Sequence, residues 1–132
     1  MEKILSTLQS RKKAPVRLTR NSVLFKTVIR AIQEKKGEAI VSLDLKKIDE
    51  AVADYFVLCE ADNPVQVRAI AMHVVEEVAA TVGERPFHKE MGEHWTLVDF
   101  VNIVVHVFLK DQRRFYDLES LWMDAGRMEH GE

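Results

Sequence analysis

The chain has 132 residues, of which 47% are hydrophobic and 30% charged, and its formal net charge is −2. This composition allows one buried core without disulfides, and the charge excludes a uniformly basic nucleic-acid-binding protein. The single cysteine, Cys59, excludes an internal disulfide and suits a reducing compartment. No apolar run approaches the roughly 18–20 residues that cross a bilayer, and no secretory signal is visible. We therefore expect a cytoplasmic protein with no membrane partner, with the organellar matrix as the alternative.

Residues 1–20 carry six basic side chains against one acid, Glu2, so the rest of the chain is acidic. Arg11, Lys12 and Lys13 precede Pro15, and no apolar period is sustained there. We predict a flexible basic N-terminal tail over residues 1–20. Such a tail is either a solvated arm or a segment in which Arg11, Lys12 and Lys13 contact RNA phosphates.

The first half of the folded part reads as helix, strand, strand, helix. A helix is expected to begin at Asn21 or Ser22 and to stop at Gly37. Residues 39–45 and 54–59 have the composition of strands. Pro64 follows an Asp-Asn turn and starts a helix that runs to about residue 82.

The second half is expected to add strands and one more helix. A short extended piece at 85–88 is a candidate edge strand, and residues 95–100 and 102–109 read as two strands joined by a tight turn. Both faces of the second strand are apolar, which predicts a central strand covered on both sides. A final helix is predicted from residue 111 to residue 122.

These elements predict an α+β fold with a mixed β-sheet of about five strands, flanked by helices on both faces. Residues 21–123 are then a single domain, and residues 124–132 a C-terminal tail.

The usual catalytic and metal-binding motifs are missing from the sequence. The cysteine and the five histidines form no recognised zinc spacing, and there is no glycine-rich phosphate loop. A nucleotidyltransferase needs paired carboxylates for metal ions, and Asp44 and Asp54 could meet only across adjacent strands. We therefore expect no enzyme, no cofactor and no metal. The alternative is a metal-dependent nucleotidyl or phosphoryl transfer enzyme that uses Asp44 and Asp54.

Protein recognition is better supported by the residue types. Trp95, Leu97 and Asp99 alternate along one strand and so share a face. A carboxylate on a core face is costly unless it is paired. We therefore expect this face to be a surface that suits a basic protein partner. Cys59 is expected to be a small buried hydrophobe, and His106 a buried, hydrogen-bonded histidine.

The chain also resembles a known family, the ribosomal silencing factors, also called RsfS or Iojap. The stretches that match cover roughly residues 37–125. They are Leu43-Asp44, Asp54-Tyr-Phe-Val-Leu-Cys59, Gln66-Val67-x-Ala69-Ile-Ala71, Trp95-x-x-x-Asp99, Val104-Val-His106-Val-Phe108 and Arg114-Phe-Tyr116-x-Leu-Glu119-x-Leu-Trp122.

The resemblance implies a translational repressor. Such factors bind the large ribosomal subunit at its ribosomal protein fourteen and sterically block association with the small subunit, which lowers translation when nutrients are scarce. The implied fold is similar to a nucleotidyltransferase without its catalytic residues, and the implied free state is a homodimer.

The resemblance also assigns roles to individual residues. It implies that Trp95 is the apolar anchor of the partner surface, with Leu97 beside it and Asp99 as the charge partner. Glu90 matches an acidic position in the preceding loop. The resemblance further implies that three residues support this surface from behind: His106, Tyr116 and Glu119.

Overall fold

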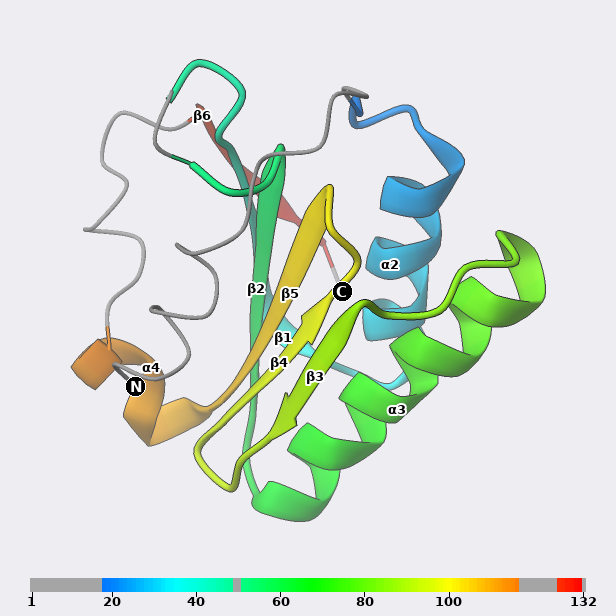
Figure 1. Cartoon of the computed structure of the whole chain (residues 1–132). Helices are drawn as coiled ribbons and strands as arrows, with labels where there is room; N and C mark the ends of the chain where they lie inside the picture. The colour runs from blue at the N-terminus through cyan, green and yellow to red at the C-terminus, as the bar shows by residue number, and fades with distance from the viewer. Residues whose placement is uncertain (1–17, 49–50, 117–125, 132) are drawn as a thin grey trace.

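The computed structural model describes residues 18–48, 51–116 and 126–131 (Figure 1). The elements follow one another in this order: α2 (Val23–Glu34), β1 (Glu38–Asp44), β2 (Tyr55–Ala61), α3 (Pro64–Thr81), β3 (His88–Met91), β4 (Trp95–Asp99), β5 (Ile103–Leu109), α4 (Lys110–Tyr116) and β6 (Gly126–His130).

The strands form one six-stranded sheet in the order β3-β4-β5-β2-β1-β6. β2 and β5 run parallel, and the other neighbouring pairs are antiparallel. The parallel pair requires a crossover, and α3 with the β3–β4 hairpin supplies it. The predicted α+β fold with a mixed sheet is confirmed, with one strand more than expected.

Both faces of the sheet are buried. α2 and α3 lie side by side on one face, and α4 lies on the opposite side, at the end of β5 (Figure 1). The apolar side chains of β5 divide between the two faces of the sheet. Val105 and Val107 lie in the core under the helices, and Val104 and Phe108 lie in a second core on the other face. The prediction of a strand covered on both sides is therefore confirmed.

Local sequence explains where the two long helices begin and end. Asn63 caps α3, because its side-chain oxygen accepts a hydrogen bond from the Gln66 backbone N–H at 2.9 Å, and Pro64 is the first helical residue. Gly83 follows α3 with a φ of +76°, and its N–H donates to the carbonyl of Val78. At the end of α2, a Cβ on Gly37 would clash with Cγ2 of Ile32, so a larger residue would force a neighbour to shift.

The predicted C-terminal tail at residues 124–132 is wrong for Gly126–His130. These residues form β6 and pair with β1, from Ile40↔His130 to Asp44↔Gly126. The segment is polar, its residues are mostly exposed, and its one large hydrophobic residue, Met128, is 45% exposed. An edge strand held by backbone hydrogen bonds has no hydrophobic alternation from which it could be predicted.

The predicted N-terminal tail at residues 1–20 ends too late. The Leu18 backbone N–H donates to Oδ2 of Asp54 at 2.8 Å. Arg20 donates from Nε to Ser42 Oγ at 3.0 Å and from Nη2 to the Gly126 carbonyl at 2.9 Å. Residues 18–20 therefore belong to the folded unit, whereas Arg11, Lys12 and Lys13 lie outside the described residues.

Two smaller expectations also change. The edge strand is β3 at His88–Met91, three residues later than the predicted 85–88. The last helix begins at Lys110, directly after β5 and one residue earlier than predicted, with Asp111 in its first turn. The predicted continuation to residue 122 lies outside the described residues.

Candidate functional site

β4 holds three of the four predicted partner-binding residues and lies between β3 and β5. In this register Trp95 is opposite Phe108, Leu97 is opposite His106, and Asp99 is opposite Val104. All five residues of β4 are buried. Each buried polar group on β4 therefore needs a hydrogen-bond partner.

Trp95 and His106 form a buried hydrogen bond. The Trp95 Nε1–H donates to Nδ1 of His106 at 3.0 Å. Nδ1 must then be unprotonated, so neutral His106 carries its proton on Nε2. The Trp95 ring also stacks on Phe108, with centroids 5.2 Å apart, and the His106 ring lies 4.6 Å from that of Phe56. The expectation of a buried, hydrogen-bonded His106 is confirmed.

Burial also fixes the charge of His106. It lowers the pKa of His106 from 6.5 to about 3, because a cation there would lose its hydration. Among the residues that the structure describes, its buried Nε2 has no hydrogen-bond partner. His106 is therefore a neutral part of the core and holds the Trp95 indole in place.

Asp99 uses its carboxylate to hold the turn between β4 and β5. Its Oδ1 accepts a hydrogen bond from the Val101 backbone N–H at 2.8 Å. Val101 has a φ of +76°, which is unfavourable for a β-branched residue. The carboxylate therefore stabilises a strained turn.

The expectation that Trp95, Leu97 and Asp99 form an open surface is wrong for this structure. The three residues are only 4%, 1% and 1% exposed. Trp95 and Leu97 lie in the second core together with residues of the β1–β2 connection, such as Leu45 and Val52. The Asp99 carboxylate can be buried because a backbone N–H two residues away donates a hydrogen bond to it.

The accessible part of this region is the edge strand β3 and its flanks. Glu90 pairs with Leu97 across the β3–β4 hairpin, and its side chain is 24% exposed and 3.1 Å from Nε2 of His88. Phe87 is 68% exposed and Met91 37% exposed. β3 also ends the sheet, so one of its backbone edges has no neighbour among the described strands.

Sequence reasoning missed Phe87 and Met91. The available signal was Phe87 directly after Pro86, beside polar residues that leave no apolar face for it to join. We call Phe87, Glu90 and Met91 the β3 edge patch. Of the predicted supporting residues, Tyr116 is the last residue of α4, and Glu119 lies outside the described residues.

The two candidate catalytic carboxylates are both held by protein groups. Asp44 accepts from the Lys46 backbone N–H at 3.0 Å, and its Oδ2 lies 3.7 Å from Nζ of Lys46. Asp54 is fully buried, and its Oδ2 accepts from Leu18 N–H and from Asn102 Nδ2. Among the described residues, the one group of three potential metal ligands lies elsewhere, between α2 and α3.

Comparison with known proteins decides the family. A family model described as "Ribosomal silencing factor during starvation" matches residues 19–132. The chain belongs to the ribosomal silencing factor family. A relative named "Ribosomal silencing factor RsfS" from Halalkalibacterium halodurans is 40% identical over 111 residues, which cover 83% of this chain and 93% of that protein.

Two further family comparisons extend this result. The maize protein named "Protein Iojap, chloroplastic" is 34% identical over 80 residues, which cover 57% of this chain and 33% of that protein. A crystal structure of a Chromobacterium violaceum protein aligns with a TM-score of 0.70 at 33% identity, over 75% of this chain and 82% of that one. Within the described residues of this family member, no helix is long and apolar enough to span a membrane.

Proposed function

We propose that this chain silences translation by binding the large ribosomal subunit at its ribosomal protein fourteen, where its bulk blocks association with the small subunit. The observation that carries the proposal is the family match over residues 19–132. A ribosome-associated silencing role follows from the family. Our proposal adds which subunit is bound, which ribosomal protein is contacted, and that the block is steric.

We further propose that the β3 edge patch contacts the ribosomal protein, and that the buried residues of β4 support the patch. Phe87 and Met91 offer exposed apolar area, and Glu90 offers a carboxylate for a basic side chain. Trp95, Leu97 and Asp99 are buried, so they shape the hairpin that presents Glu90. A contact of this kind combines an apolar anchor with a polar rim.

Sedimentation tests the main proposal. The purified chain is mixed with isolated large and small ribosomal subunits and run on a density gradient at moderate salt. We expect the chain to migrate with the large subunit alone and the joined-ribosome peak to fall. Migration with neither subunit would refute the proposal. Magnesium-dependent nucleotide binding that is lost in Asp44→Ala would support the enzyme alternative instead.

Variants of the patch test the contact residues. Phe87→Ala removes an exposed ring, and as an interface anchor it should cost about 2 kcal/mol of binding, or roughly a 30-fold weaker Kd. Glu90→Lys should weaken binding by repelling a basic partner. Val23→Ala is the matched control, because Val23 is 60% exposed but lies on α2, away from β3. Unchanged binding in Phe87→Ala and Glu90→Lys would exclude the β3 edge patch.

The free state and the location complete the proposal. We propose a homodimer in the absence of ribosomes and a cytoplasmic location, with an organellar matrix as the alternative because the maize relative is named chloroplastic. Sedimentation velocity of the free chain across a concentration series tests the dimer. A single monomer boundary at all concentrations would reject it.

A further inference from the structure

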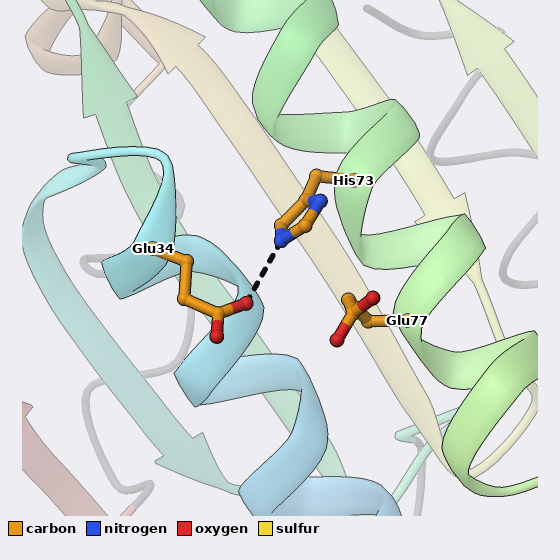
Figure 2. Close-up of side chains that lie close together, drawn as sticks. All are labelled: Glu34, His73 and Glu77. Carbon is orange, nitrogen blue, oxygen red and sulfur yellow. Dashed lines mark hydrogen bonds and ion pairs between the residues drawn. The ribbon is translucent and has the colours of Figure 1, made fainter.

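Three potential metal ligands from α2 and α3 lie close together between the two helices (Figure 2). Glu34 is the last residue of α2, whereas His73 and Glu77 lie one turn apart on α3. Nε2 of His73 is 2.8 Å from Oε1 of Glu34. One ligand atom from each of the three residues lies within 4.8 Å of the others.

We propose that Glu34, His73 and Glu77 bind a zinc ion that joins α2 to α3. An imidazole nitrogen and two carboxylate oxygens are ordinary zinc ligands, and three protein ligands with a water complete a tetrahedral site. Zinc–ligand bonds of about 2.0–2.2 Å place tetrahedral ligand atoms roughly 3.4 Å apart. The ligand atoms lie within 4.8 Å of one another, so binding requires them to shift by an ångström or so.

The histidine distinguishes this group from an ordinary acidic surface. A His-x-x-x-Glu pair at positions i and i+4 presents both side chains on the same face of α3. Glu34 faces that pair from the neighbouring helix, as Figure 2 shows. The side chains of His73 and Glu77 are only 20% and 31% exposed, so two of the three ligands are partly ordered by packing.

Arg30 is the group that zinc would displace. Its Nη2 lies 3.5 Å from Oε1 of Glu77, and its Nε lies 4.0 Å from Oε2 of Glu34. These are long ion pairs on a side chain that is 48% exposed, and pairs of this kind contribute little. Arg30 also donates to Oγ1 of Thr81 at 3.2 Å, a partner that it keeps when the metal binds.

The sequence does not reveal this group because its members are far apart along the chain. Glu34 and His73 are separated by 39 residues, and no local spacing joins them. Only the packing of α2 against α3 brings them together.

Calorimetric titration of the full chain with zinc chloride tests the proposal. We expect one zinc per chain, and at least a tenfold loss of affinity in His73→Ala, Glu34→Gln and Glu77→Gln. Glu76→Gln is the matched control, because Glu76 is an exposed acid next to Glu77 that is not in the group. Arg30→Ala should bind zinc more tightly, since it removes the competing cation.

Thermal stability separates a specific zinc site from incidental zinc binding. Zinc should raise the Tm of the wild type and of Glu76→Gln but not of Glu34→Gln, while the far-ultraviolet spectra of all three stay alike. No binding, or binding that is equal in the wild type, His73→Ala and Glu34→Gln, would overturn the proposal. Neither result depends on binding to the ribosome.

Discussion

The hydrogen bond from Trp95 to Nδ1 of His106 exists only while that nitrogen carries no proton. Sequence patterns predicted that His106 is buried, because it lies between apolar residues on a central strand. They could not show that Trp95 is its partner, since the pairing depends on the register of β4 and β5. The sequence also does not separate core from interface for Trp95, because an aromatic residue at the start of a strand occurs in both.

We expect His106 to make the fold sensitive to acid. Its pKa is about 3 in the folded chain and about 6.5 when unfolded. Between these values the unfolded chain binds one more proton, so stability is full above pH 6.5 and falls as the pH drops towards 3. From pH 7 to pH 5 the free energy of unfolding should fall by about 2 kcal/mol from this group. Urea unfolding at the two pH values measures it.

A variant isolates that contribution from the other titrating groups. His106→Gln cannot take up a proton but keeps an oxygen that can accept from Trp95 Nε1. Its unfolding free energy should be lower than that of the wild type at pH 7, yet should change by about 2 kcal/mol less between pH 7 and pH 5. Parallel pH profiles for the two proteins would contradict a neutral, buried His106.

Cys59 should be chemically inert in the folded chain. It lies on β2 with no exposed surface, and burial raises the pKa of its thiol to about 12. The thiolate is the form that reacts, and the Cys59 thiol is neither exposed to reagents nor ionised at neutral pH. We expect no alkylation by iodoacetamide at pH 8 over an hour in native buffer, and complete alkylation in 8 M urea, as measured by intact mass. Rapid native alkylation would show that β2 opens.

At the scale of elements, the helix signals in the sequence were reliable because each acts locally. The helix predicted from Pro64 to about residue 82 agrees with α3 within a residue. β6 and the position of β3 could not be predicted in this way, since both are short, polar edge strands. Their positions depend on backbone pairing with β1 and β4, which leaves no periodic pattern in the side chains.

The cap of α3 gives a test at this scale. Asn63→Ala removes the acceptor for the Gln66 N–H, and we expect it to lower the free energy of unfolding by about 1 kcal/mol. Asn63→Asp keeps an acceptor oxygen and adds a negative charge at the helix N-terminus, so it should retain wild-type stability or exceed it slightly. Chemical denaturation at pH 7 compares the three proteins. Wild-type stability in Asn63→Ala would mean that the cap contributes nothing.

At the scale of the whole molecule, charge divides the chain into two parts. The first 17 residues hold five basic side chains and one acid, which leaves fourteen basic and twenty acidic side chains in the rest. The family match begins at residue 19, so it does not cover this basic segment. An acidic folded unit repels RNA phosphates, whereas a basic segment attracts them.

Deletion of residues 1–17 tests this division, because Leu18 and Arg20 remain to bind Asp54 and Ser42. If Arg11, Lys12 and Lys13 contact ribosomal RNA, affinity for the large subunit should fall more at low salt than at high salt. The slope of log affinity against log salt should become shallower by about 2 to 3, since each phosphate contact contributes roughly 0.7 to 0.9. Replacing only these three residues with glutamine should reproduce the change. An unaltered slope in both variants would leave recognition to the folded unit alone, through contacts such as the β3 edge patch.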